Sequence, residues 1–226
     1  MKIDIVFPNK NEKKFIEIAE KLDFDGLCFI YKFQKLDSIN KKLNELSKNT
    51  KLKLFTGLIA DQRDINKAKK FSNLVLTKST EKDQHILEKS PPDILFNMEA
   101  FAKRDPTHFR ASGLNQILCK LASKNKVIIP IPLKIISDAE NKPLIIGRIM
   151  QNIKLCKKYK VNQAICSFAE KPYQMKATND LISLGISLGM DIPLAKKSLN
   201  FVFEKISENT KKKSPDYFGE GIELVK

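Results

Sequence analysis

Short apolar runs and longer amphipathic segments alternate along almost the whole chain. The apolar runs are four to eight residues long and are rich in Ile, Val, Leu and Phe. Runs without a polar face are typical of strands that are buried on both sides of a sheet. We expect strands at residues 3–7, 26–31, 52–59, 74–77, 93–96, 127–133 and 163–167.

Between these runs, apolar residues recur every three or four positions among Lys, Glu and Asn, which predicts amphipathic helices. The first such segment places Phe15, Ile16, Ala19 and Leu22 on one face. Helices that regularly separate buried strands indicate right-handed parallel crossovers. We expect helices at residues 11–22, 37–47, 65–71, 81–89, 113–123, 144–159, 180–188 and 194–206.

The number of strands bears on the choice between a closed barrel and an open sheet. Seven runs are found where a regular (β/α)₈ barrel has eight strands. No strand is followed by a G-x-G-x-x-G or a G-x-x-x-x-G-K-[ST] pattern, which removes the commonest reason for an open nucleotide-binding sheet. We predict an α/β fold with a distorted, TIM-barrel-like (β/α) barrel, whose eighth strand is missing or replaced near residues 190–192. Pro130 and Pro132 predict that the sixth strand is short or irregular.

A single barrel domain is expected to occupy residues 1–208. Residues 209–226 are expected to form a Lys-rich link, which frays over 209–214, and an extended C-terminal tail from 217 to 225. The apolar runs are far shorter than the ~20 residues that a membrane-spanning helix needs, and no basic stretch followed by an apolar one begins the chain. We therefore expect a cytoplasmic protein with no membrane association.

The charge balance of the chain indicates what kind of partner it binds rather than how it folds. The chain has 41 Lys and Arg against 26 Asp and Glu, a net charge of +15. Such an excess indicates a nucleic-acid partner or, less often, an acidic membrane surface. The alternative is compositional drift, since only four of the basic residues are Arg, but drift does not explain the shortage of acids. With no Trp and four Tyr, backbone contact is favoured over base stacking.

Residues for metal binding or nucleophilic catalysis are scarce. The four cysteines are far apart and lie among apolar residues, which predicts buried free thiols: Cys28, Cys119, Cys156 and Cys166. His85 is expected on a solvated helix face and His108 in a basic loop, and neither is paired with a nucleophile. Asp4 and Asp93, in or beside strands, are expected to cap or to pair with a neighbouring base. No catalytic residue, metal site or bound cofactor is therefore predicted for this chain.

The strongest local candidate for a phosphate site is the loop at residues 103–110. It carries Lys103, Arg104 and Arg110, and it leads into a predicted helix start at 112–115, where free N–H groups favour an anion. Arg in so Lys-rich a chain indicates that a planar, forked donor matters there. The alternative is a structural Arg104–Asp105 pair in a solvated loop. Lys134, after the sixth strand, is a further cation at the functional end of a parallel barrel.

Three stretches together resemble a known family. They are Arg-Asp-Pro at 104–106 with Gly-Leu-Asn at 113–115 and Ala122; Ser-Phe-Ala at 167–169 with Asn-Asp-Leu-Ile-Ser-Leu-Gly at 179–185; and Gly-Met-Asp-Ile-Pro-Leu-Ala-Lys-Lys-Ser at 189–198. The chain resembles archaeal ribonuclease P protein component 3, from the strand of Asp4 to the tail at 221–225. The resemblance implies a barrel related to the polymerase-and-histidinol-phosphatase superfamily but without its metal centre.

The resemblance also implies a role and a set of residues. Members of this family support the catalytic RNA of ribonuclease P, which needs magnesium and removes 5′ leaders from precursor tRNA, and they pair with protein component 2 beside other protein subunits. By position, the implied residues are Arg104, Asp105, Lys120, Lys134, Lys176, Asp180 and Lys196. Three positions depart from the usual pattern: Lys134 and Lys176 stand where Arg is common, and Gln116 where His is often found. A lysine keeps the charge but loses the bidentate fork.

The primary hypothesis is a non-catalytic protein subunit of ribonuclease P that contacts RNA through Lys103, Arg104, Arg110, Lys120, Lys134, Lys176 and Lys196. Asp105 and Asp180 are expected to be structural or to orient the site. Precursor tRNA is expected to be reached indirectly, through the complex. Two alternatives stay open: a metal-dependent phosphoesterase on the same barrel, and a general RNA-binding barrel that belongs to no fixed complex.

Overall fold

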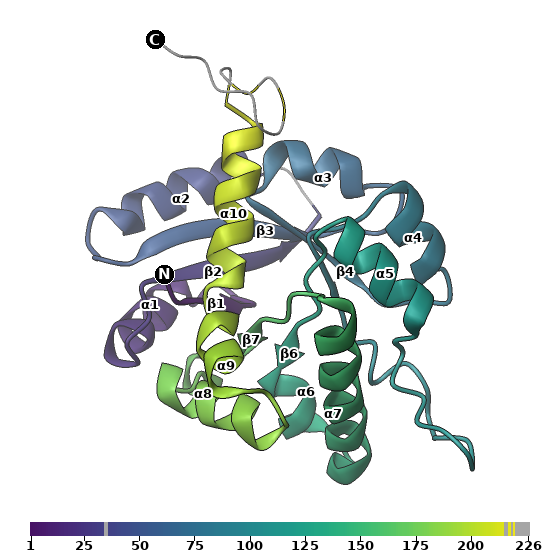
Figure 1. Ribbon diagram of the computed structural model, residues 1–226. Helices are drawn as coiled ribbons and strands as arrows, with labels where there is room; N and C mark the ends of the chain where they lie inside the picture. The colour runs from purple at the N-terminus through teal and green to yellow at the C-terminus, as the bar shows by residue number, and fades with distance from the viewer. Residues whose placement is uncertain (34–35, 215–216, 218, 220–226) are drawn as a thin grey trace.

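The computed structural model describes residues 1–33, 36–214, 217 and 219 (Figure 1). Five parallel strands form one sheet in the order β1-β2-β3-β4-β5, and two further parallel strands, β6 and β7, pair with each other. The strands are β1 (Ile3–Val6), β2 (Gly26–Lys32), β3 (Lys53–Ile59), β4 (Leu74–Lys78), β5 (Ile94–Phe96), β6 (Ile131–Pro132) and β7 (Ile165–Cys166).

Single bridges join the two sheets on both sides and close the ring of strands. Ile94 in β5 is bridged to Ile128, three residues before β6, and the Leu95 N–H donates to the Ile128 carbonyl (3.1 Å). On the other side Val6 is bridged to Ala169, and the Phe7 N–H donates to the Ala169 carbonyl (2.8 Å). The predicted α/β barrel is therefore confirmed, and its distortion lies in the short β6 and β7.

No eighth strand is found at residues 190–192, where Asp191 directly precedes a helix. Because β7 contacts β1 without an intervening strand, the eighth strand is missing rather than replaced. The sixth strand is short, as its two prolines predicted: β6 retains only Ile131 and Pro132.

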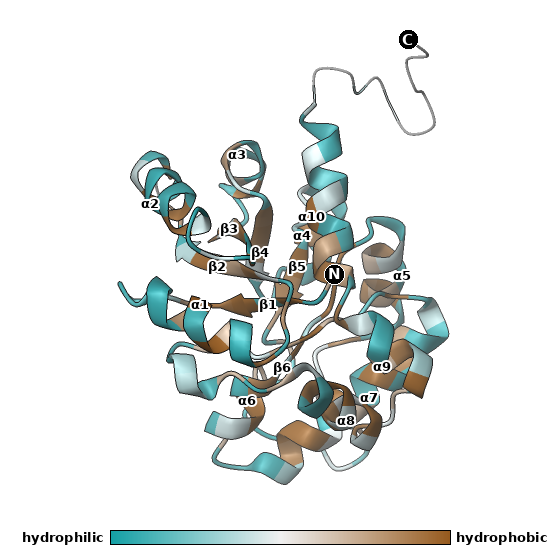
Figure 2. Ribbon diagram, turned by 90° about the vertical axis from the view of Figure 1, so that its left-hand side faces the viewer, coloured by the Kyte–Doolittle hydropathy of each residue, from teal (hydrophilic) through white to brown (hydrophobic). Residues whose placement is uncertain are grey.

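The described helices surround the strands: α1 (Glu12–Lys21), α2 (Asp37–Ser47), α3 (Ile65–Phe71), α4 (Asp83–Lys89), α5 (Gln116–Lys124), α6 (Leu133–Asp138), α7 (Lys142–Tyr159), α8 (Thr178–Ser187), α9 (Ile192–Ser198) and α10 (Phe201–Lys212), with a 3-10 turn, η1 (Pro172–Gln174). In Figure 2 the hydrophobic colour gathers on the strands and on the helix faces turned toward them. One apolar cluster fills the barrel, and others lie between the strands and the outer helices.

The end of the chain differs from the sequence prediction in two ways. The helix expected at 194–206 is divided into α9 and α10, because the carbonyl of the intervening Leu199 turns to accept from the N–H of Ile3 at the start of β1. Residues 209–212, expected to fray, are helical; Lys212 pairs with Glu208 one turn earlier (2.8 Å), and the Asn209 amide donates to the Asn73 carbonyl. The helix α10 closes the N-terminal end of the barrel with Phe201, Val202 and Ile206.

The position of the domain boundary at residue 208 stays a prediction. Of the expected tail at 217–225, only residues 217 and 219 fall within the described residues. The four cysteines are buried and free, as predicted. Among the described helices, none combines the length and the apolar character needed to cross a bilayer.

Candidate nucleic-acid interface

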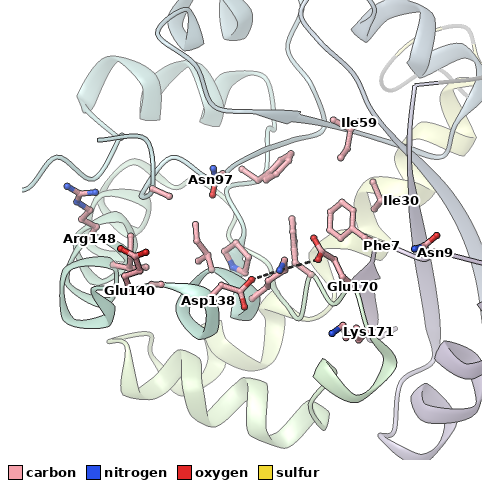
Figure 3. A pocket seen from close by; sticks show the side chains of 18 of the residues that line it. Phe7, Asn9, Ile30, Ile59, Asn97, Asp138, Glu140, Arg148, Glu170 and Lys171 are labelled. Carbon is pink, nitrogen blue, oxygen red and sulfur yellow. Dashed lines mark hydrogen bonds and ion pairs between the residues drawn. The ribbon is translucent and has the colours of Figure 1, made fainter. Parts of the chain in front are cut away.

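A cleft of about 1260 Å³ opens at the carboxyl ends of the strands (Figure 3). Residues that follow β1, β2, β5, β6 and β7 line it, together with α6 and the start of α7. In a parallel barrel this end carries the functional side chains, because the loops there are free to vary without disturbing the strands. The cleft is therefore the first place to look for a site.

Three phenyl rings form the floor of the cleft. Phe168 lies between Phe7 and Phe96, with ring centroids 5.5 Å and 5.8 Å apart. Phe168 follows β7 and has a left-handed backbone (φ 53°), as does Asn97 after β5 (φ 68°). A bulky residue rarely adopts this conformation, and it persists only where the surrounding packing holds it in place. Asn adopts this conformation readily, so the backbone strain lies at Phe168, where β7 ends at the cleft.

The rim of the cleft carries three exposed lysines and one lysine that is held by carboxylates. Lys32, Lys103 and Lys171 are exposed, and within the described residues no carboxylate lies at ion-pair distance from any of them. Lys134 is held between Asp138, to which it donates a hydrogen bond, and Glu170 at 3.3 Å. The hydrogen bond with Asp138 and the nearby Glu170 raise the pKa of Lys134 above its usual value.

Phenyl groups, which cannot act as metal ligands, occupy three of the strand ends at the cleft. Within the described ranges, no three or more His, Cys, Asp or Glu residues are grouped so that they could hold a metal ion. Asp93 accepts from the Val75 N–H and lies 3.9 Å from Lys205, the pairing with a base that the sequence predicted. Asp4 Oδ1 accepts from the backbone N–H groups of Ile5 (2.9 Å) and Ser167 (2.7 Å). Among the described residues, Asp4 has no basic partner, and its buried Oδ2 has no hydrogen-bond partner.

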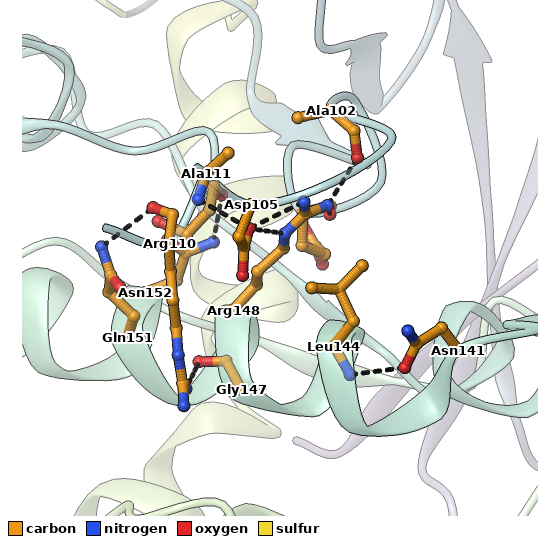
Figure 4. Close-up of polar contacts among 12 residues, drawn as sticks. Ala102, Asp105, Arg110, Ala111, Asn141, Leu144, Gly147, Arg148, Gln151 and Asn152 are labelled. Carbon is orange, nitrogen blue, oxygen red and sulfur yellow. Dashed lines mark hydrogen bonds and ion pairs between the residues drawn. The ribbon is translucent and has the colours of Figure 1, made fainter. Parts of the chain in front are cut away.

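The basic loop is anchored by an arginine from another element (Figure 4). Arg148, in the middle of α7, is fully buried and donates through Nη1 to the carbonyls of Glu99 and Ala102 (2.7 Å each). Its Nε donates to Asp105 Oδ1 (2.8 Å), and its Nη2 lies 2.8 Å from the same oxygen without hydrogen-bond geometry. The alternative reading of the loop, an Arg104–Asp105 pair, is therefore wrong: Asp105 pairs with Arg148, and Arg104 is exposed.

Asp105 also fixes the far end of the loop, because it accepts from the Ala111 N–H (2.8 Å). Burial alone would raise the pKa of Asp105, but the Ala111 N–H and the Arg148 guanidinium outweigh it and lower this pKa. Asp105 thus stays ionised at neutral pH and holds residues 105 and 111 together. Whether Asp105 orients an RNA-binding site, as the sequence suggested, stays a prediction.

Arg110 is exposed, but its guanidinium is tied to α7. Its Nη1 donates to the Gly147 carbonyl (2.7 Å), and a Cβ on Gly147 would be 2.4 Å from that nitrogen. We expect Gly147→Ala to displace the Arg110 guanidinium, because that side chain can move and the helix backbone cannot. The gain in helix propensity, about 1 kcal/mol, offsets the lost contact, so the free energy of unfolding should change by less than ~1 kcal/mol. Amide hydrogen exchange checks this: protection of residues 108–111 should fall, and unchanged protection would contradict it.

The start of α5 offers less to an anion than expected. The helix begins at Gln116, and its cap Asn115 accepts from the Leu118 N–H (2.9 Å). One of the free N–H groups that the sequence assigned to a phosphate is therefore taken by the chain itself. The predicted phosphate site thus has fewer backbone donors than expected, and the side chains of the loop carry more of it.

The structure brings together only some of the predicted site residues. Lys103 and Lys134 line the cleft, while Arg104 and Arg110 belong to the loop beside it. The others are exposed on outer helices or next to them: Lys120 on α5, Lys176 and Asp180 at the start of α8, and Lys196 on α9. The RNA contacts of all these residues stay predictions.

Sequence reasoning missed several residues of the cleft. Arg148 follows the apolar stretch 144–146, and this was the available signal that its guanidinium is buried. Phe7, Phe96 and Phe168 each end a predicted strand or follow one directly, which marks them as residues of the barrel mouth. Lys32 and Lys171 gave no signal beyond their charge.

Comparison with solved structures shows a related fold. The chain superimposes on a protein of an archaeal ribonuclease P, seen by cryo-EM with mature tRNA, with a TM-score of 0.82 and 23% identity over 99% of this chain and 98% of that one. A histidinol phosphate phosphatase from Lactococcus lactis, solved with zinc, L-histidinol and phosphate, gives a TM-score of 0.57 and 8% identity over 90% and 93%. These likenesses confirm a distorted TIM-like barrel fold, which the histidinol phosphate phosphatase shares.

Curated relatives carry the name ribonuclease P protein component 3. The protein from Thermococcus kodakarensis is 35% identical over 103 residues, which are 45% of this chain and 44% of the relative. The protein from Methanosarcina acetivorans is 30% identical over 122 residues, 53% and 51% of the two chains, so these matches span about half the length of the relatives. The protein from Methanocaldococcus jannaschii is 27% identical over 196 residues, 80% and 79% of the two chains. The model of the family described as RNase P subunit p30 matches residues 1–214. The resemblance found in the sequence is confirmed, and the chain belongs to the RNase P subunit p30 family.

Proposed function

We propose that this chain is a non-catalytic protein subunit of ribonuclease P, which supports the catalytic RNA while that RNA removes 5′ leaders from precursor tRNA. The single observation that carries the proposal is the composition of the barrel mouth. Phenyl rings occupy its floor, and lysines without carboxylate partners stand on its rim. Such a mouth offers binding surface and cations, and the described residues supply no ligand cluster for hydrolytic chemistry.

The proposed mechanism is neutralisation of RNA phosphates by cations that the fold holds in place. Each phosphate neutralised releases condensed counterions, which contributes about 0.7 to 0.9 to the log–log salt slope of binding. Lys103, Arg104 and Lys134 would act at or beside the cleft, and Arg110 through the donors that Gly147 leaves free. Lys120, Lys176 and Lys196 would extend the contact over the outer helices. Folded RNA would be recognised by shape and backbone.

The proposal also covers the partners. The RNA of ribonuclease P, protein component 2 and other protein subunits would assemble with this chain, and precursor tRNA would be contacted through the complex. Magnesium would be required by the RNA and not held by this chain. The complex would work in the cytoplasm, where tRNA precursors are processed.

Reconstitution tests the proposal. We expect omission of this chain from a mixture of the RNA and the other subunits to lower precursor-tRNA cleavage at low magnesium, because fewer RNA charges are then neutralised. Unchanged cleavage would refute the proposal. Turnover of a simple phosphate ester by the chain alone, with added divalent ions, would favour a phosphoesterase instead. Competition with bulk RNA separates a specific subunit, which resists it, from a general RNA-binding barrel.

A single-residue variant tests the phosphate contacts. We expect Arg104→Gln to reduce the salt slope of RNA binding by about 0.7 to 0.9, because one phosphate contact is lost. The measurement is the affinity for the ribonuclease P RNA at a series of salt concentrations. Lys14→Gln, at an exposed position on α1 that does not line the cleft, removes the same charge and serves as the control. Equal salt slopes for the two variants would contradict the proposed contact of Arg104 with an RNA phosphate.

A further inference from the structure

The phenyl floor of the cleft has no role in neutralising phosphates. Phe7 and Phe96 are partly exposed to the cleft, and the strained backbone at Phe168 holds a third ring between them. The outer rings are tilted by 48° and 51° from Phe168, so a conjugated ring can lie face to face on one of them and edge-on to another, and every nucleobase offers such a ring. The floor therefore points to the bases of the RNA partner rather than to its backbone.

Polar groups above the floor suit the edge of a base. The side-chain amides of Asn9 and Asn97 line the cleft. Neither amide makes a hydrogen bond to another described residue; Asn9 donates to Asn11 only through its backbone N–H. Each amide can both donate and accept, so either can meet any of the four base edges. Recognition by such groups tolerates sequence while it still requires a base.

The free cations stand around the cleft rather than on one side of it. Lys32 ends β2, Lys103 lies in the loop after β5, and Lys171 lies in the loop after β7. Two of the carboxylates at the cleft, Asp138 and Glu170, are engaged by Lys134.

One carboxylate of the described cleft lining, Glu140, is not engaged by a lysine. In Figure 3 Glu140 lies toward the Arg148 end of the cleft, at a distance from Lys171 and Asn9. Three free cations thus face one free carboxylate, and the sign of the rim complements a phosphate.

We propose that this cleft captures an unpaired nucleotide of an RNA strand, with the base against Phe7, Phe96 and Phe168 and the adjoining phosphates at Lys32, Lys103 and Lys171. The inference rests on the proposed function, because it assumes an RNA partner. A volume of about 1260 Å³ accommodates a nucleotide and its neighbours. A double helix keeps its bases stacked inside, so only a loop, bulge or strand end could place a base on this floor.

Binding of the full chain to short single-stranded RNA tests the proposal. The probes are an oligonucleotide and an oligomer of the same length without bases, both at fixed salt. Since a base stacked on an aromatic ring contributes a factor of about 5 to 150, we expect the first probe to bind at least about fivefold more tightly. Phe7→Leu and Phe96→Leu should reduce that ratio while the barrel stays folded. Phe71→Leu, which changes a phenyl group that is 65% exposed on α3, is the matched control.

Photocrosslinking locates the bound base independently of affinity. An oligonucleotide with a single 5-iodouridine should crosslink to the phenyl rings of the cleft, and peptide mapping identifies them.

Lys32→Gln and Lys171→Gln should weaken the binding of both probes and lower the salt slope, whereas Lys14→Gln should do so less. Crosslinks elsewhere, equal affinity for the two probes, or a cleft that a second protein subunit fills to the exclusion of RNA would each overturn the proposal.

The two proposals fail in different experiments. If omission of the chain lowers precursor-tRNA cleavage but the two probes bind equally, the nucleotide proposal falls and the subunit role stands. If the base-dependent affinity and the crosslinks are found but cleavage does not need the chain, the cleft binds a nucleotide and the proposed function is wrong.

Discussion

Arg148→Met should lower the free energy of unfolding by about 3 kcal/mol. The guanidinium is fully buried, and its removal leaves two buried carbonyls and the Asp105 carboxylate without their donor. Removal of one partner from a buried ion pair costs about 3 to 5 kcal/mol, and the lower end applies because the Asp105 side chain is 21% exposed. In a chain of this length, that loss lowers the midpoint of thermal unfolding by about 6 to 12 °C. Urea unfolding and thermal scans measure both quantities.

Two further variants are informative. One tests whether the forked shape of the Arg148 guanidinium matters beyond its charge, and the other whether the loss is specific to this buried arginine. Arg148→Lys keeps the charge but cannot reach the carbonyls and Asp105 together, so an intermediate loss is expected. Arg104→Met changes an exposed arginine of the same loop and should cost less than ~0.5 kcal/mol. Similar losses for Arg104→Met and Arg148→Met would show that Arg148 does not anchor the loop.

The loss of Arg148 should also reach the proposed RNA contacts. The guanidinium ties Glu99, Ala102 and Asp105 to α7, and these residues flank Lys103 and Arg104. An unanchored loop must be ordered when RNA binds, and the ordering entropy reduces the affinity. The buried arginine thus connects the stability of the barrel to the placement of its exposed cations.

The fold was predictable because its signals are local. Strands buried on both faces give apolar runs wherever they occur, and the run at 127–133 contained the prolines that shorten β6. The division between α9 and α10 could not be predicted, because it depends on the carbonyl of Leu199 accepting from Ile3, almost two hundred residues away. Periodicity shows which residues are apolar and does not show where a helix is interrupted to complete a distant strand.

The sequence showed which residues of the candidate site are charged, but not which side chains they contact. The loop at 103–110 was correctly identified as a basic surface segment, but the nearest opposite charge suggested an Arg104–Asp105 pair. The actual partner, Arg148, follows 43 residues later, and even its signal of burial does not show which carboxylate it contacts. The sequence places three Phe residues at strand ends, but it does not show that their rings meet to form one floor.

Two buried carboxyls should make the protein less stable as the pH rises. Burial raises the pKa of Asp4 to about 6 and that of Glu99 to about 7, whereas the unfolded chain titrates both near 4. Between these values the folded state binds more protons than the unfolded state, so the free energy of unfolding falls with increasing pH. The contribution of Asp4 is lost between about pH 4 and 6, and that of Glu99 between about pH 4.5 and 7. Each loss is about 3 kcal/mol at most.

The difference between a variant and the parent chain isolates each group. Other carboxyls, such as Glu12 and Glu208, have lowered pKa values and act in the opposite direction, so the total curve mixes both effects. Glu99→Gln cannot titrate, and its unfolding free energy minus that of the parent should rise by about 3 kcal/mol from pH 4.5 to 7 and stay constant above. Asp4→Asn should show the same rise between about pH 4 and 6. Glu81→Gln, at an exposed position, should give a difference that is flat within ~0.5 kcal/mol. A flat difference for Glu99→Gln would mean that its carboxyl is not held protonated by burial, and that the base of the basic loop is open to water.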